Sequence, residues 1–155
     1  MMSTYLVALL VAVSAGHAHA THCHPGMPCW PQYQHWADLA SSLDGDAIFA
    51  WDERYHEEII MYNTRVTRFP YVIVMAESLD DVIKSVKFAN KFKVRLTVRS
   101  SGHDYIGRAT ADGSLQINLK RMKKLRFDLN SDFSPAGIVT AQSGNTWLRV
   151  YNEVT

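Results

Sequence analysis

The sequence predicts a mixed α and β fold that is built around one βαβ unit. Two short runs that are rich in branched apolar residues, 71–75 and 94–98, have the composition of buried strands. Between them, Ser78 and Asp81 have the S-x-x-D spacing of a capping box, and apolar residues follow at helical spacing to about Phe92. A strand, a helix and a strand with short connections predict two parallel strands joined by a right-handed crossover.

The composition is that of an ordinary globular protein. The 155 residues carry a formal net charge of +1, and 47% of them are hydrophobic. Neither disorder nor an electrostatic surface for nucleic acid is indicated. The basic residues between 120 and 126 form a short cluster, for which a solvated turn is the favoured interpretation. We therefore expect no nucleic-acid partner.

Residues 1–20 have the features of a secretory signal peptide. The apolar run 6–13 is too short to span a bilayer, and Ala18-His19-Ala20 fits the A-x-A rule for cleavage after Ala20. The segment 1–5 lacks the usual Lys or Arg. We expect a secreted, extracellular protein that has no membrane contact once the signal peptide is removed.

Residues 21–65 are expected to form a separate helical or irregular region. Its two cysteines, Cys23 and Cys29, could pair with each other or with a partner outside the chain, and the sequence does not decide between these. Nearby His residues allow a metal-binding hypothesis, but no standard zinc-finger spacing is present, so a plain surface segment is favoured. Helical spacing after Trp30-Pro31 predicts a helix that ends before the turn 44–46.

Two weaker elements complete this region. The apolar run 48–51 is consistent with a strand, and 52–62 with an exposed turn of helix. One His and two Glu residues in that turn, 56–58, could suggest acid–base chemistry, but a solvated helix face is favoured. Pro70 marks a boundary before the βαβ unit, because a residue that precedes proline is held extended.

Further elements follow the βαβ unit. Alternation predicts a strand at 114–118, and two more strands are expected at 125–128 and 137–141. Apolar residues at helical spacing begin a helix at 146–154. The chain stops within that helix without a C-cap, so we expect it to be part of a longer protein.

A loop of small residues follows the second strand of the unit, with the sequence Arg99-Ser100-Ser101-Gly102-His103-Asp104-Tyr105. Ligands of α/β sheets bind at the carboxyl ends of strands, and the amides of such a loop can face an anion. A Ser-His-Asp hydrolase is rejected, because near neighbours in sequence seldom reach triad geometry. No Walker or G-x-G-x-x-G loop is present.

The loop resembles the pyrophosphate loop of the FAD-linked oxidases related to berberine bridge enzyme. These oxidases belong to the vanillyl-alcohol oxidase / p-cresol methylhydroxylase (PCMH) superfamily. The flanking segments 70–82, 88–99, 114–119 and 141–147 resemble successive segments of the family in order and spacing. The resemblance implies an α+β fold, in which 66–155 is the N-terminal part of a PCMH-type FAD-binding domain.

The resemblance also implies the cofactor and its contacts. In such enzymes the loop histidine is attached covalently to the 8α-methyl group of the flavin, and His103 occupies that position. Loop amides would cradle the pyrophosphate. The cofactor-binding residues that follow are His103, Arg99, Ser100, Ser101, Gly102, Asp104, Tyr105, Ser143 and Gly144.

Three of these positions leave alternatives open. Arg99 could add charge to the site or could only solvate the end of its strand. Tyr105 could order the loop through its hydroxyl group or by packing alone. Many members of the family have glycine where this chain has Ser101. Serine would be strained there if the position requires a positive φ, and harmless otherwise.

The implied function is that of a secreted FAD-dependent oxidoreductase. It would oxidise a small organic substrate by hydride transfer to the flavin, with O₂ as the electron acceptor. No residue of this chain is a credible catalytic base, which in the family comes from the later substrate domain, so the chain alone is expected to be inactive. The alternatives are an inactive flavin-binding or structural homologue and, less favoured, a His/Cys metal-binding secreted protein.

Overall fold

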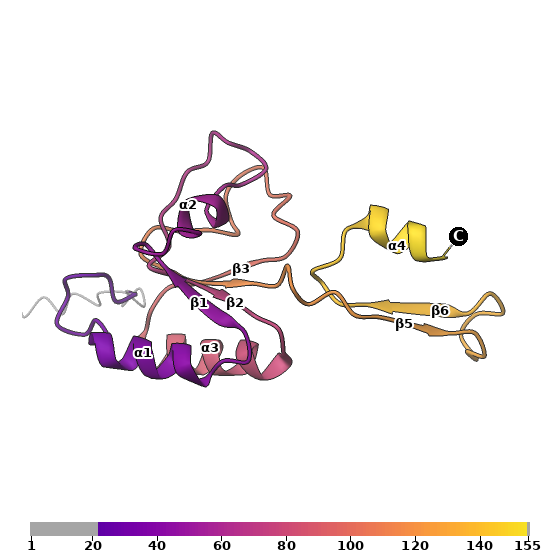
Figure 1. The fold of residues 1–155 in the computed structure, drawn as a ribbon, viewed down its shortest axis with the longest axis horizontal. Coiled ribbons are helices and arrows are strands. Elements are labelled where there is room, and N and C mark those ends of the chain that lie inside the picture. Colours follow the sequence, from indigo (N-terminus) through magenta and orange to yellow (C-terminus); the bar gives the residue numbers. More distant parts are fainter. Residues whose placement is uncertain (1–21, 155) are drawn as a thin grey trace, which may run out of the picture.

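The computed structural model describes residues 22–154, so the predicted signal peptide at 1–20 lies outside the described residues. A mixed sheet with its helices forms one part, and a β-hairpin with a short helix extends from it (Figure 1). In chain order the elements are α1 (Tyr33–Ser42), β1 (Asp46–Phe49), α2 (Tyr55–Glu58), β2 (Val72–Met75), α3 (Leu79–Phe92), β3 (Leu96–Arg99), β4 (Leu115–Asn118), β5 (Leu125–Asp128), β6 (Ile138–Ala141) and α4 (Trp147–Val154).

The main sheet has the strand order β1-β2-β4-β3. Strands β2 and β3 both run parallel to β4, and β1 runs antiparallel to β2. The two strands of the predicted βαβ unit are therefore confirmed as parallel, but β4 lies between them. Met75, Asn118 and Arg99 are in register across the three parallel strands. The segments that follow these residues consequently meet at one edge of the sheet, the carboxyl edge.

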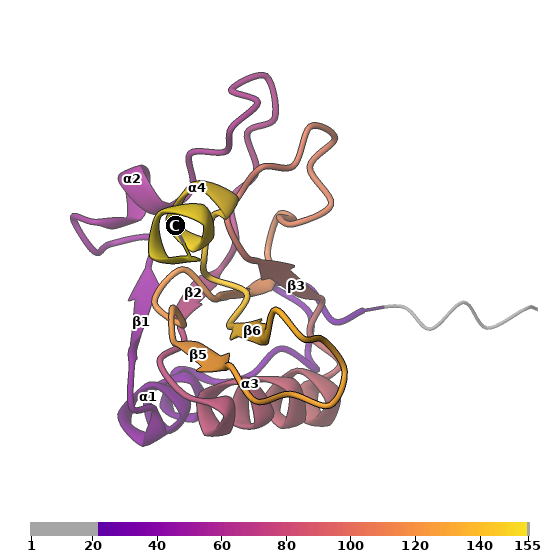
Figure 2. The ribbon, with the colours of Figure 1, turned by 90° about the vertical axis from the view of Figure 1, so that its right-hand side faces the viewer.

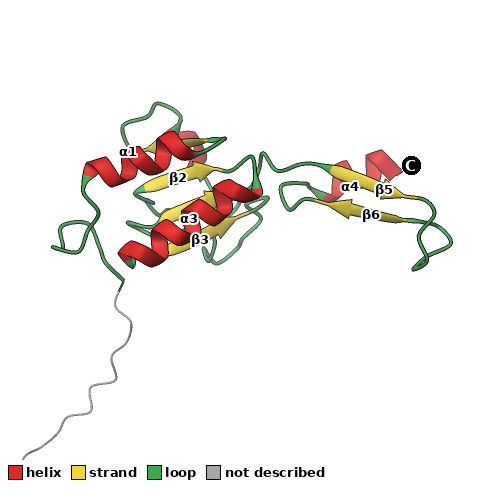
Figure 3. Cartoon of the chain, turned by 90° about the horizontal axis from the view of Figure 1, so that it is seen from below, coloured by secondary structure: helices red, strands yellow, loops and turns green. Residues whose placement is uncertain are grey.

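Both faces of the sheet are covered, which explains why every residue of β2 is apolar and buried. Helices α1 and α3 lie on one face (Figures 1 and 3), where Trp36 of α1 packs with Val72 and Val74 in the larger core. The alternate residues Ile73 and Met75 contribute to a second cluster on the opposite face, with residues of β1 and of the α2 region. Alternate side chains of β2 thus point to opposite faces of the sheet and pack into two different cores.

The N-terminus of α3 is closed by the predicted capping box. The Ser78 hydroxyl accepts a hydrogen bond from the Asp81 amide at 3.1 Å, and the Asp81 carboxylate accepts one from the Ser78 amide. The same carboxylate, which is fully buried, also accepts hydrogen bonds from the amides of Asp44 and Gly45. The cap therefore also fixes the turn between α1 and β1.

Residues 22–65 share the sheet and the core with the residues that follow them, although the sequence suggested a separate region. Strand β1 pairs with β2, and the Cys23 amide donates to the Lys93 carbonyl at 2.8 Å. Cys23 and Cys29 form a disulfide, so the pairing that the sequence left open is intramolecular. The disulfide also removes both thiolates as metal ligands. Within residues 22–154 there is no group of at least three His, Cys, Asp or Glu side chains that could hold a metal ion.

The predicted strands β5 and β6 form an antiparallel hairpin that extends away from the main sheet (Figures 1 and 2). Helix α4 lies alongside this hairpin and buries Val150. All four residues of β6 are exposed. In the part of the chain that is described, no helix is long and apolar enough to cross a membrane.

Candidate functional site

The small-residue loop follows β3 at the carboxyl edge of the sheet, as predicted. Gly102 has φ +80°, and a Cβ at this position would lie only 2.8 Å from Nε of Arg99. The positive φ therefore favours glycine at 102, and an added Cβ would in addition displace the end of the Arg99 side chain. Among residues 22–154, Lys93 is the only non-glycine residue with a positive φ. Ser101 is consequently unstrained, and the departure from the family pattern at that position is harmless.

Four consecutive backbone amides in this loop, those of residues 100–103, remain available to a ligand. Within residues 22–154 none of them donates a hydrogen bond to another protein group, whereas the next amide, that of Asp104, donates to the Gly102 carbonyl at 2.9 Å. The four residues line a cavity of about 720 Å³. Adjacent free N–H groups in a loop form an anion-binding concavity, so this donor set fits a diphosphate.

Three segments line the cavity, and the sequence pointed to only part of it. They are residues 60–62, 99–103 and 145–147. The predicted contact residues Ser143 and Gly144 lie just outside this lining. A Cβ on Gly144 would come within 2.1 Å of the Leu119 carbonyl oxygen, so this glycine allows a close approach to the turn after β4. Their direct contact with a cofactor stays a prediction.

Arg99 has a role that neither sequence alternative described. Its guanidinium donates hydrogen bonds to the backbone carbonyls of Glu58 and Ile60, the latter at 2.8 Å. Burial lowers the pKa of Arg99, and the negative charge of Glu58 opposes this effect. The side chain thus ties the end of β3 to the C-terminal end of α2.

The ring of His103 packs in a group of three with those of Tyr62 and Tyr105. Its ring centroid is 4.2 Å from that of Tyr62 and 5.1 Å from that of Tyr105, both in edge-on arrangements. A hydrogen bond with Tyr62 raises the pKa of the Tyr105 hydroxyl. Tyr105 thus packs against both rings, and its role in ordering the loop around a cofactor stays a prediction.

Asp104 shapes the loop that follows the histidine. Its carboxylate accepts hydrogen bonds from the amides of Ala109 at 2.7 Å and Ile106 at 3.1 Å. The hydrogen bond from Ala109 is the largest influence that lowers the pKa of Asp104, and partial burial opposes it. Both oxygens are engaged within the loop, so this residue supports the site by holding the backbone of residues 104–109.

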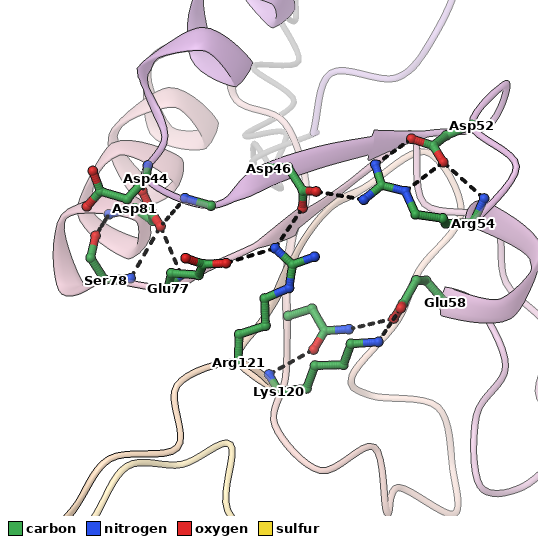
Figure 4. Close-up of polar contacts among 12 residues, drawn as sticks. Asp44, Asp46, Asp52, Arg54, Glu58, Glu77, Ser78, Asp81, Lys120 and Arg121 are labelled. Atoms are coloured by element: carbon green, nitrogen blue, oxygen red, sulfur yellow. Dashed lines mark hydrogen bonds and ion pairs between the residues drawn. The ribbon is translucent and has the colours of Figure 1, made fainter.

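The carboxyl edge also carries a network of charged side chains (Figure 4). Glu58, expected on a solvated helix face, is buried, pairs with Lys120 and accepts from Asn118 Nδ2 at 3.4 Å. In the one-turn helix α2, Tyr55 and Glu58 are three residues apart and therefore face the sheet together. Arg121 bridges Asp46 and Glu77. The basic turn is solvent-exposed in part, as expected, but Lys120 and Arg121 are also engaged in ion pairs.

A phosphate-type loop with a histidine, placed at the carboxyl edge of a mixed sheet, defines the site of a nucleotide-containing cofactor. The family model described as "FAD binding domain" matches residues 70–155, which is more than half of the chain. The chain therefore belongs to the FAD-binding domain family, and its cofactor is FAD.

Three similar proteins illustrate the relationship. A flavin-dependent oxygenase from Aspergillus ustus is 40% identical over 73 residues, which is 47% of this chain and 13% of that protein. The structure of 6-hydroxy-D-nicotine oxidase from Arthrobacter nicotinovorans matches 56% of this chain and 19% of its own, with 31% identity and a TM-score of 0.54.

A third match is the glucooligosaccharide oxidase from Acremonium strictum, which carries a 6-S-cysteinyl, 8α-N1-histidyl FAD. The match covers 77% of this chain and 24% of that one, with 24% identity and a TM-score of 0.66, and it shows that the fold is shared. In each of the three comparisons, the matched segment covers less than a quarter of the known protein's length.

Proposed function

We propose that the protein containing this chain is an FAD-dependent oxidoreductase in which His103 holds the flavin covalently. A small organic substrate would be oxidised by hydride transfer to the flavin, and O₂ would accept the electrons. The observation that carries the proposal is the position of His103, an exposed imidazole that adjoins four free backbone amides in one cavity. The amides bind the diphosphate, and the imidazole lies within the same lining.

One imidazole nitrogen of His103 forms a bond to the 8α carbon, and the N–H bond and one 8α C–H bond break. The two protons and two electrons that are released reduce O₂ to H₂O₂. Neutral imidazole is a competent nucleophile near pH 7, whereas serine and lysine side chains are not without activation. When bound, FAD supplies the hydride acceptor for the substrate reaction.

The residues of this chain would bind and orient the cofactor. The anion site would consist of the backbone amides of residues 100–103. Arg99 would hold the start of this loop through its hydrogen bond to the Ile60 carbonyl. Asn145, Thr146 and Trp147 line the other side of the cavity. None of the described residues in the cavity is assigned the role of a catalytic base.

We also propose that the protein is secreted after removal of residues 1–20. The disulfide between Cys23 and Cys29 supports this proposal, because disulfides persist in oxidising compartments. Retention of the protein in the cytosol when the complete gene is expressed in its own host would contradict it.

The test uses the protein expressed from its complete gene. After acid denaturation and removal of small molecules, covalently held flavin remains on the polypeptide and can be measured by absorbance and by the mass of the peptide that contains His103. We expect His103→Ala to lose this flavin. His56→Ala is the control, because His56 is exposed on α2 and does not line the cavity.

Each outcome has a distinct meaning. Wild-type protein that releases all of its flavin would overturn the covalent attachment. Release of H₂O₂ with a substrate from a panel of alcohols, sugars and alkaloids would support the oxidase activity. Flavin-loaded protein that is inert towards such a panel, and towards artificial electron acceptors, would point to an inactive homologue.

A further inference from the structure

We infer that residues 58–63, here called the clamp segment, position His103 for its attachment to the flavin, and that Tyr62 is the positioning residue that orients the imidazole. The inference rests on the proposed covalent attachment and extends it to a part of the chain that precedes the family match at 70–155. Within the clamp segment, buried residues anchor the backbone, and exposed residues contact the histidine loop.

The clamp segment is anchored to the body of the protein by every second residue. Ile59 and Met61 are buried, with exposed fractions of 8% and 2%, whereas Ile60 and Tyr62 are exposed, and residues 60–62 line the cavity. At the start of the segment, the buried Glu58 carboxylate is paired with Lys120. The cavity-facing residues are thus presented by a backbone that the core and one ion pair hold in place.

The clamp segment binds the histidine loop on both sides of His103. Before the histidine, the Tyr62 amide donates to the Gly102 carbonyl at 3.4 Å. After it, the Asn63 side-chain amide donates to the Tyr105 carbonyl at 2.7 Å, across 42 residues of sequence. Contacts on either side restrict the backbone from which the imidazole projects.

The ring of Tyr62 then restricts the imidazole itself. It lies edge-on to His103 at 4.2 Å between centroids and to Tyr105 at 5.4 Å, and the residue is 62% exposed. An exposed tyrosine that contributes little to the core would be free to adopt several rotamers, but this one is held in a three-ring contact. A reactive group held in one orientation reacts faster than one that samples many, so we expect the ring to accelerate attachment.

The experiment follows attachment with time in the complete protein. Apoprotein prepared under riboflavin limitation is mixed with FAD, total bound flavin is measured after gel filtration, and covalent flavin is measured after acid denaturation. We expect Tyr62→Ala to slow attachment roughly 10-fold, the scale of one aromatic contact, while total FAD binding changes by less than about 2-fold. Tyr62→Phe keeps the ring and is expected to restore most of the rate.

Tyr33→Ala is the matched control. Tyr33 is 67% exposed, and its ring centroid lies 6.5 Å from that of Trp51, but it does not line the cavity. Its removal is therefore expected to leave the attachment rate unchanged. Attachment by Tyr62→Ala at the wild-type rate would overturn the inference. An equal loss of total FAD binding and attachment would also overturn it, because the residue would then act in binding only.

Two further results keep the outcomes separate. If Tyr62→Ala does not fold, as judged by thermal unfolding, Asn63→Ala decides, because it removes the hydrogen bond to Tyr105 and otherwise only a local one that Asn63 accepts from the Arg65 amide. Asn63→Ala is expected to slow attachment, and a wild-type rate would refute the clamp. If wild-type protein itself attaches no flavin, the covalent proposal fails first and the inference falls with it, which differs from a failure seen only in the variants.

Discussion

The guanidinium of Arg99 covers Gly102 so closely that a Cβ at 102 would lie 2.8 Å from Nε and 2.9 Å from Nη2. The same guanidinium is held by the carbonyls of Glu58 and Ile60, so it cannot move away without breaking two hydrogen bonds. The backbone at Gly102 also has φ +80°. The turn that exposes the free amides therefore depends on the absence of a side chain at this residue.

Gly102→Ala is expected to destabilise the protein by about 2–3 kcal/mol, the sum of the backbone strain and the displacement of Arg99, and to weaken FAD binding. Thermal unfolding and a titration with FAD measure the two effects. Gly26→Ala is the control, since Gly26 has φ +89° with nothing within 4 Å of its added Cβ and therefore reports the strain alone. Equal losses of stability in the two variants would show that the Arg99 side chain moves away from the added Cβ at no cost.

The ion pair of Glu58 and Lys120 is expected to respond asymmetrically to the removal of its partners. The Glu58 side chain is 11% exposed, whereas that of Lys120 is 44% exposed. Lys120→Met leaves a buried carboxylate without its charged partner and should cost about 3 kcal/mol in unfolding free energy, whereas Glu58→Gln leaves an ammonium group that can reach water and should cost about 1 kcal/mol.

Chemical denaturation of the two single variants and of the double variant measures these costs and the coupling between the residues. The exposed pair of Arg68 and Asp112 is the comparison, for which we expect a coupling of less than about 1 kcal/mol. A smaller cost for Lys120→Met than for Glu58→Gln would contradict the assignment of Glu58 as the buried partner.

Asp81 is expected to make stability depend on pH. Burial opposes its ionisation, but hydrogen bonds from the amides of residues 44, 45, 77 and 78 outweigh burial, so the pKa of Asp81 is lowered. A carboxyl whose pKa is lower in the folded state adds stability above its unfolded pKa of about 4, and that stability is lost as the pH falls toward the folded pKa.

Asp81→Asn should therefore cost about 2 kcal/mol at pH 7 and progressively less below about pH 4, as measured by urea denaturation across this range. Ser78→Ala removes the other half of the capping box without removing the carboxylate. Its cost should be about 1 kcal/mol at all of these pH values. A cost of Asp81→Asn that does not change with pH would rule out the ionised carboxylate as the source of the stability.

Individual helices and strands could be predicted where the apolar residues recur at a clear helical or strand spacing. Helix α3 begins at its predicted cap because Ser78 and Asp81 satisfy each other across three residues of sequence. The position of β4 between β2 and β3 could not be predicted, because strand order depends on long-range pairing that no local pattern encodes. For the same reason, the pairing of β1 with β2 could not be predicted.

The histidine loop could be predicted because its residues are contiguous, and their resemblance to a flavoprotein loop is local. The contribution of Tyr62 could not, because it is 41 positions away from His103 and lies in a segment too short to show any periodicity. The burial of Glu58 could not be predicted either, because a single helical turn gives no repeat from which to infer its buried face. Trp147 belongs to the segment 141–147, which resembles the family, and it lines the cavity.

The insertion of β4 between β2 and β3 also bears on the order in which the chain can fold as it is synthesised. A nascent chain that has exposed both strands of the βαβ unit still lacks the strand that joins them, because each makes its parallel ladder with residues 115–118. Until those residues leave the ribosome, β2 can pair only with β1, and the inner edge of β3 stays open. The histidine loop is thus translated before β4, the strand that joins β3 to the rest of the sheet.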